Sequence, residues 1–211
     1  MGRPWKVAAA ALAFVLSACG DTFVPPVVAT GTSVITYYVP GTDYGAFPTY
    51  AIVSKIIYVD DTTGTPTYTF QDAPEILAAV ERNMDARGYR LVARIDPESP
   101  PATPPLADLA LTVFGFVGTD YAYYPCDYWG WWGYPDYGCD QPWEWVAYRT
   151  GLLLIEMGDL VNRQPGPPPV VPRLWAGAGY SVLTPESAAN TSIAVRAVDQ
   201  AFAQSPYLQT P

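Results

Sequence analysis

Hydrophobic and polar positions divide the chain into predicted strands and two helices. Six segments are rich in β-branched, aromatic and aliphatic residues, with turn residues between them, and a shorter one at 67–70 resembles them. Residues 89–95 alternate between apolar and polar side chains, which indicates a strand with one solvated face. The segment 107–117 is apolar at both odd and even positions, as a strand covered on both faces would be. The six predicted strands are 34–38, 49–59, 89–95, 107–117, 145–157 and 173–183.

Two segments have the apolar stripe and end signals of helices. Asp72 and Glu75 have the spacing of a capping box, and Gly88 is a natural residue to follow a helix end, so we expect a helix over 73–87. Thr184 and Pro185 are suited to begin a second helix, and Pro206 ends it. The element order predicts an α+β fold. We expect a mostly antiparallel sheet of about five to six strands, with both helices packed on one face.

The N-terminus has the features of a bacterial secretion signal. Arg3 and Lys6 precede a short apolar run, which is well below the ~20 residues of a membrane-spanning helix. The run closes on Leu-Ser-Ala-Cys at 16–19, which resembles a lipobox. The resemblance implies cleavage before Cys19, attachment of lipid to its sulfur and acylation of the new amine, with several acyl chains giving firm attachment. The alternative is a signal anchor that stays uncleaved.

The predicted organisation is a signal peptide at 1–18, a tether at 19–33 and a single α+β domain at 34–208. Lipoprotein sorting in enteric bacteria implies that Asp directly after the lipidated cysteine retains a protein in the inner membrane. Gly20 stands there instead, so we expect the outer membrane, facing the periplasm. Removing residues 1–18, which hold two basic and no acidic residues, takes the net charge from −9 to −11. Such an acidic chain is not expected to bind nucleic acid.

Two further cysteines, Cys126 and Cys139, form an even pair in an oxidising compartment. We expect them to form a disulfide, with two free thiols as the alternative. Two thiolates at this spacing, in a chain without histidine, do not match a zinc site. No cofactor or metal is expected.

The cysteines bracket an insertion at 119–144 that is rich in tyrosine, tryptophan and glycine. Aromatic side chains with a polar edge are enriched at binding surfaces, where they stack on sugar rings or anchor a protein partner. Two alternatives remain: the rings bury one another against the sheet, or the insertion is disordered. The candidate binding surface consists of Tyr128, Trp129, Trp131, Trp132, Tyr134 and Trp143.

Catalytic signals are sparse. Without histidine, the usual serine and cysteine triads lack their base, and the chain has no phosphate-binding or dinucleotide-binding motif. Five acidic residues crowd the insertion, where they would serve a carboxylate-based glycan hydrolase or bind calcium, although their spacing matches no EF-hand loop. We expect no enzymatic activity. These acidic residues are Asp120, Asp127, Asp136, Asp140 and Glu144.

Several short segments, in this order, resemble a family of bacterial lipoproteins known as domain of unknown function 4136. The resemblance spans most of residues 47–207 and implies an α+β envelope lipoprotein, without assigning catalytic residues. The segments are Phe47-Pro48-Thr49-Tyr50-Ala51-Ile52, Arg87-Gly88-Tyr89, Ala107-Asp108-Leu109, the run 151–159 (GLLLIEMGD), Leu174-Trp175-Ala176-Gly177-Ala178 and Ser205-Pro206.

The sequence therefore predicts a lipid-anchored envelope protein with a structural or partner-binding role. Its expected partners are the membrane, through the N-terminal lipid, and envelope proteins or glycan. The second hypothesis is a lipoprotein that binds peptidoglycan or another glycan through the aromatic insertion. The third is the carboxylate-based glycan hydrolase.

Overall fold

The computed structural model describes residues 32–59, 69–99, 101–116, 121–122, 132, 138–139, 146–147, 151–164, 170–182 and 187–210. The elements, in chain order, are β1 (Ser33–Tyr38), the 3-10 turn η1 (Tyr44–Ala46), β2 (Thr49–Val53), β3 (Ile57–Val59), α1 (Ala73–Asp85), β4 (Arg90–Ile95), β5 (Leu109–Phe116), β6 (Tyr121–Ala122), β7 (Gly138–Cys139), β8 (Val146–Ala147), β9 (Leu152–Asp159), β10 (Val170–Val171), β11 (Arg173–Tyr180) and α2 (Ser187–Ala203).

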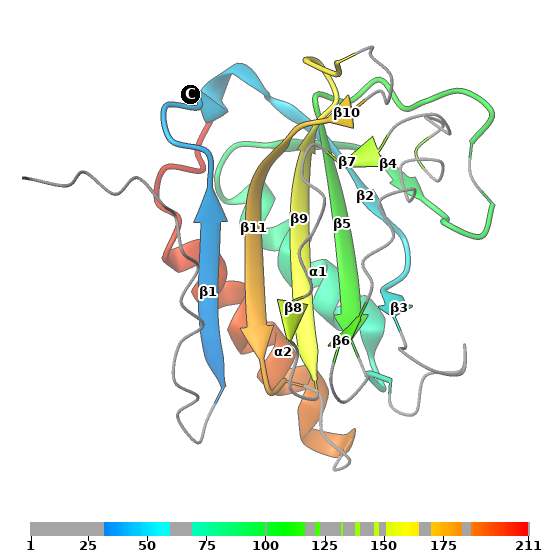
Figure 1. Cartoon of the computed structure of the whole chain (residues 1–211), viewed down its shortest axis with the longest axis vertical. Coiled ribbons are helices and arrows are strands. Elements are labelled where there is room, and N and C mark those ends of the chain that lie inside the picture. Colours follow the sequence, from blue (N-terminus) through cyan, green and yellow to red (C-terminus); the bar gives the residue numbers. More distant parts are fainter. Residues whose placement is uncertain are drawn as a thin grey trace, which may run out of the picture.

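One main sheet organises the molecule, and both helices lie on the same side of it (Figure 1). Its strand order is β1-β11-β9-β5-β2-β4, and β3 pairs with the far end of β5. The short strands β6 and β8 form a separate antiparallel pair, and β7 and β10 form a parallel one. The predicted α+β class, with two helices on one face, is confirmed.

The sheet is more mixed than the mostly antiparallel sheet that the sequence predicts. The pairs β1–β11, β11–β9 and β9–β5 are antiparallel, but β2 is parallel to both β4 and β5, and β3 is parallel to β5. The parallel pairing of β2 with β4 follows from α1, which connects β2 and β3 to β4. A helical crossover returns the chain to the starting end of the sheet, so the next strand runs parallel.

Most predicted element boundaries are close to those observed. The Asp72 side chain accepts a hydrogen bond from Glu75 N at 3.3 Å, and α1 begins at Ala73 as predicted. The helix ends at Asp85, two residues earlier than predicted, and a turn leads to Gly88 at φ +87°. The start of α2 at Thr184 and Pro185 lies outside the described residues.

Three predicted strands differ in detail. The segment 49–59 is split into β2, which pairs with β4 and β5, and β3, which pairs with β5 alone, with the bend at Ser54–Ile56 between them. Phe70 is not in a strand, and the rest of 67–70 is described only at Thr69. The predicted strand 145–157 corresponds to β8 and, after undescribed residues, to β9, which continues to Asp159.

The core lies between the sheet and the helices. β5 and β9 are buried along their whole length, as predicted for 107–117. Gly177 on β11 allows α2 to approach, because a Cβ at that position would lie 2.9 Å from the Ala201 Cβ and 2.8 Å from the Trp175 ring. The Trp175 ring packs on Phe202 with ring centroids 5.1 Å apart. Trp175 and Gly177, which belong to a segment of the family resemblance, thus shape the contact between β11 and α2.

Candidate functional site

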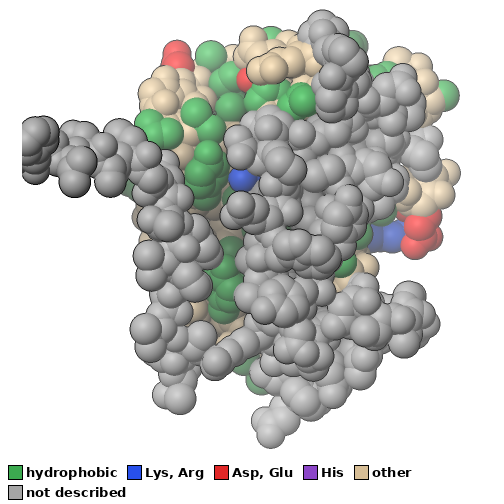
Figure 2. All heavy atoms as spheres, viewed as in Figure 1, with side chains coloured by type: hydrophobic (Ala, Val, Ile, Leu, Met, Phe, Trp, Pro, Cys, Tyr) green, Lys and Arg blue, Asp and Glu red, His purple; other side chains and the backbone are tan. Residues whose placement is uncertain are grey.

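The most exposed aromatic residues of the described chain lie side by side on the edge strand β1. Tyr37 is 51% exposed and Tyr38 is 46% exposed, although both belong to a strand of the main sheet. Consecutive residues of a strand point to opposite faces, so the two rings flank the edge. In the view of Figure 2, hydrophobic side chains are visible between the grey atoms on the side of the molecule where β1 lies. An edge strand with exposed tyrosines has the composition of an interaction surface.

Each of the two rings is held by a residue from another part of the fold. The Arg173 guanidinium lies 5.0 Å from the centroid of the Tyr37 ring, a cation–π contact. The Tyr38 ring contacts the Tyr207 ring, with centroids 4.6 Å apart, and Tyr207 also contacts Tyr44. These contacts fix the rings, which lowers the conformational entropy lost when a partner covers them.

A buried carboxylate, that of Glu156, in turn holds Arg173 in place. Its Nη1 lies 2.9 Å from Glu156 Oε1 on β9, where the Glu156 side chain is only 3% exposed. Because a buried charge is stable only when it is paired, this ion pair fixes Arg173 beside Tyr37. Glu156 is flanked in the sheet by Ala176 of β11 and Thr112 of β5. The arrangement therefore positions an aromatic ring at the edge of the sheet.

Tyr44 supports the same end of the sheet. Its hydroxyl donates a hydrogen bond of 2.8 Å to Leu174 O. Burial raises the pKa of Tyr44 to about 12, with a smaller contribution from Tyr207. The hydroxyl consequently stays protonated and remains a donor above pH 10, where an exposed tyrosine ionises.

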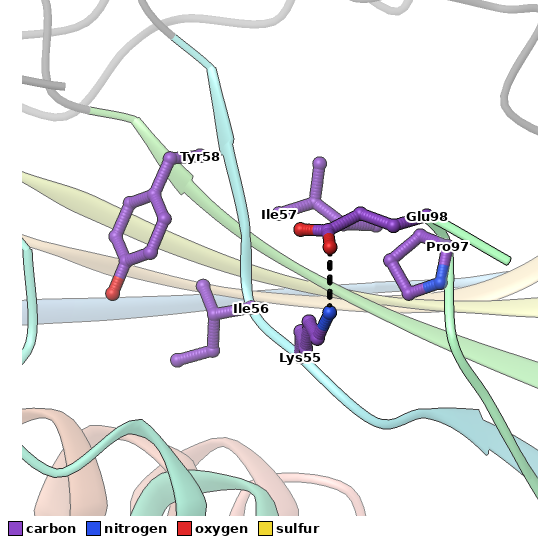
Figure 3. Close-up of a pocket in the computed structure, with 6 residues that line it drawn as sticks. All are labelled: Lys55, Ile56, Ile57, Tyr58, Pro97 and Glu98. Atoms are coloured by element: carbon purple, nitrogen blue, oxygen red, sulfur yellow. Dashed lines mark hydrogen bonds and ion pairs between the residues drawn. The ribbon is translucent and has the colours of Figure 1, made fainter. Parts of the chain in front are cut away.

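A pocket of about 360 Å³ lies elsewhere, where the bend between β2 and β3 meets the loop after β4 (Figure 3). Lys55 Nζ lies 2.8 Å from Glu98 Oε2 and 3.2 Å from Asp96 Oδ1. The Glu98 N–H and the Lys55 ammonium lower the pKa of Asp96, while both carboxylates raise the pKa of Lys55. All three side chains are exposed by 41% or more, so the pairs are weak and give no dry site for catalysis.

The segments of the family resemblance have structural roles. Asp108 Oδ2 accepts hydrogen bonds from Thr49 N at 2.9 Å and Thr49 Oγ1 at 2.6 Å, which ties β5 to β2. Trp175 Nε1 donates to Ser205 Oγ at 2.9 Å, which ties the sheet to the end of α2. Arg87 Nη2 donates to Phe202 O at 2.8 Å, which joins the two helix ends. These residues hold the domain together.

Most residues of the predicted sites lie outside the described part of the chain. This applies to Cys19, Cys126, Tyr128, Trp129, Trp131, Tyr134, Trp143 and the acidic residues of the insertion, and only the backbone of Cys139 is described, in β7. Trp132 is described and is fully buried as part of the hydrophobic core. For that residue, burial agrees with the self-packing alternative.

Sequence reasoning missed Tyr37, Tyr38 and Arg173 as members of a surface. Their signal is weak, because an uncharged strand such as 33–38 can lie at the centre or at the edge of a sheet. Within the described ranges, no three His, Cys, Asp or Glu residues gather closely enough to hold a metal ion. Among the described helices, none is both long and apolar enough to span a membrane.

Comparison with known proteins identifies relatives of this fold. A crystal structure of a DUF4136 family protein from Bacteroides thetaiotaomicron is 28% identical, with a TM-score of 0.62 over 84% of this chain and 97% of that chain. Two structures of the PelC dodecamer from Paraburkholderia phytofirmans are more distant. One is 18% identical, with a TM-score of 0.42 over 86% of this chain and 99% of that chain; the other, of a single-residue variant, is 17% identical, with a TM-score of 0.40 over 85% of this chain and 98% of that chain.

No curated protein matches the chain. The model of the family described as "Domain of unknown function (DUF4136)" matches residues 34–207, which include nearly all of the main sheet and both helices. The match agrees with the segments on which the sequence resemblance rests. The protein therefore belongs to the DUF4136 family.

Proposed function

We propose that this protein is a lipid-anchored module of the bacterial cell envelope that acts by binding a partner. The anchor is Cys19, and the residues between it and β1, which begins at Ser33, connect it to the domain. The lipobox-like sequence supports this attachment. Gly20 after the cysteine supports the outer membrane as its destination.

The observation that carries the binding role is the exposed, prearranged tyrosine pair on β1. Tyr37 is held by Arg173 and Tyr38 by Tyr207, yet about half of each residue is open to solvent. Rigid aromatic side chains provide large contact areas at a low entropic cost, and they are frequent hot spots of protein interfaces.

Three carboxylates of the described residues are engaged in structural hydrogen bonds, which supports binding over catalysis. Asp108 is engaged by Thr49, and Asp159 accepts hydrogen bonds from the following turn at Val161 N and Asn162 N. Asp72 caps α1. Carboxylates with such partners stabilise the fold, and they are not arranged around a cavity in which a substrate would react.

The anchor is tested by labelling cells with an alkyne-bearing fatty acid and isolating the full-length protein. We expect label on the wild-type protein and on Ser17→Ala, which keeps a small residue beside the cleavage site, and none on Cys19→Ala. An unlabelled wild-type protein, or label that persists in Cys19→Ala, would contradict the anchor.

The binding role is tested in cells with a photo-crosslinking amino acid at position 38. We expect discrete crosslinked species from this position and none from the matched control at position 98, where the Glu98 side chain is also exposed but lies by the pocket. The same pattern of adducts from both positions would contradict a specific surface on β1.

A further inference from the structure

The two edges of the main sheet differ in their protection against pairing with another strand. β4, at one edge, carries Arg90 and Arg94, and Arg94 pairs with Glu81 of α1 through two hydrogen bonds of 2.7 Å. Charged side chains of this kind discourage edge-to-edge association. β1, at the other edge, has the sequence SVITYY, without charge or proline, and its pairing with β11 has an unbroken register. An edge strand without such charged side chains is suited to pair with another strand.

The backbone of β1 shows which groups face outward. Val39 N donates to Leu174 O at 2.9 Å, in the same register as the pairs of β1 with β11. In an antiparallel ladder, alternate residues bond the same neighbour, so Ser33, Ile35 and Tyr37 bond β11. The N–H and C=O groups of the intervening residues, Val34, Thr36 and Tyr38, therefore point away from the sheet.

We propose that β1 pairs antiparallel with β1 of a second copy of this chain, around a two-fold axis at Thr36. The outward backbone groups belong to residues 34, 36 and 38, and Thr36 is the middle one of these. In this register Thr36 lies opposite Thr36 of the second copy. Val34 then lies opposite Tyr38 of the second copy. In an antiparallel pair, residues of this kind exchange two N–H···O bonds each. The result is one sheet that runs through both copies, with an isologous interface.

The side chains of β1 complement themselves in this register. Val34 meets Tyr38 of the second copy, Ile35 meets Tyr37 of the second copy, and Thr36 meets its own equivalent. Pairs of an aromatic with a β-branched residue, and Thr–Thr pairs, are among the cross-strand pairs that stabilise antiparallel sheets. The tyrosine rings, already held by Arg173 and Tyr207, lie next to the new strand.

Charge does not oppose contact between two copies along β1 itself. Each chain has a net charge of −9, so two copies repel each other at long range. β1 itself carries no charge, and pairing through it places no acidic side chains directly opposite one another. Because salt screens the long-range repulsion, the association should tighten as the salt concentration rises.

The proposed dimer rests on the partner-binding role proposed above and makes a second copy of this chain the partner. It does not require lipid on Cys19. Its failure would leave the fatty-acid labelling result unaffected. The test is sedimentation of the purified full chain in detergent, over a range of concentrations. We expect a dimer for wild type and for Thr36→Val, which keeps a β-branched, uncharged side chain. We expect Thr36→Lys, which places two ammonium groups across the axis, to weaken the dimer about tenfold or more.

The register is tested by disulfide crosslinking. Thr36→Cys should give a crosslinked dimer on mild oxidation, because the Cα atoms across such a pair lie about 5.5 Å apart, within disulfide range. Tyr38→Cys should not, since each Tyr38 lies opposite Val34 of the second copy. The parent chain controls for its own cysteines. A wild-type monomer at every concentration, a dimer unchanged in Thr36→Lys, or equal crosslinking from both cysteine variants would overturn the proposal.

Discussion

Replacing Gly88 by alanine should weaken the joint at which the turn after α1 contacts Thr210, near the end of the chain. Gly88 has φ +87°, a conformation that costs a residue with a Cβ about 1–2 kcal/mol. A Cβ at this position would also collide with Thr210 Oγ1, which donates a hydrogen bond of 3.2 Å to Arg87 O. Rotating the Thr210 side chain away loses this bond, which contributes about 1 kcal/mol. We therefore expect Gly88→Ala to lower the free energy of unfolding by about 2–3 kcal/mol.

Two control variants separate the free-energy cost of the positive φ at Gly88 from the cost of the collision with Thr210. Gly41 has φ +82° and nothing within 4 Å of an added Cβ, so Gly41→Ala should lose only the backbone term of about 1–2 kcal/mol. Thr210→Ala alone should lose about 1 kcal/mol. The double variant Gly88→Ala/Thr210→Ala should be no less stable than Gly88→Ala, because the same bond is lost only once.

The assay is urea unfolding of each purified full-length variant at neutral pH, followed by circular dichroism. The slope of the transition should be the same for all variants, so that the midpoint reports stability. A loss below about 0.5 kcal/mol for Gly88→Ala, or full additivity with Thr210→Ala, would refute this account of the joint.

Three further predictions concern the sheet and its contact with α2. Gly177→Ala should cost about 1–3 kcal/mol by overpacking against Ala201, and Ala201→Gly in the same chain should recover part of that loss in urea unfolding; no recovery would contradict the close approach. Trp175→Phe should cost about 1–3 kcal/mol, because the hydrogen bond from Trp175 Nε1 to Ser205 Oγ is lost. Ser205→Ala should cost less in that background than in the parent chain, since this bond is then already absent, and equal costs in the two backgrounds would contradict the coupling. Because the pKa of Tyr44 is raised from 10.0 to about 12, the native state keeps its proton where the unfolded state loses it, so this contribution to stability is complete below pH 10 and is lost as the pH rises from 10 to 12. Tyr44→Phe should make the alkaline decline shallower, and an unchanged decline would show that other groups cause it.

Local signals in the sequence were sufficient where neighbouring residues decide the structure. The start of α1 follows from Asp72 and Glu75, and the burial of β5 follows from a run that is apolar on both faces. These features depend on contacts within a few residues, which the sequence displays directly.

The parallel pairs and the candidate surface depend on long-range contacts instead. The chain's first strand, β1, pairs with β11, whose residues lie about 140 positions later, and this pairing makes β1 an edge. No local pattern shows whether SVITYY lies at the edge or the centre. The contact of Arg173 with Tyr37 likewise exists only after the sheet has formed. Of the candidate surface on the aromatic insertion, only Trp132 lies in the described part of the chain.

Mass spectrometry of the N-terminal peptide tests whether lipid on Cys19 holds the domain to the envelope. Protein extracted with detergent from the membrane fraction is digested, and the N-terminal peptide is sequenced and weighed. We expect a mature chain that begins at Cys19, with a diacylglycerol thioether on its sulfur and an acylated amine. An N-terminal peptide that begins at Met1, or one that contains Cys19 as an unmodified residue, would contradict it.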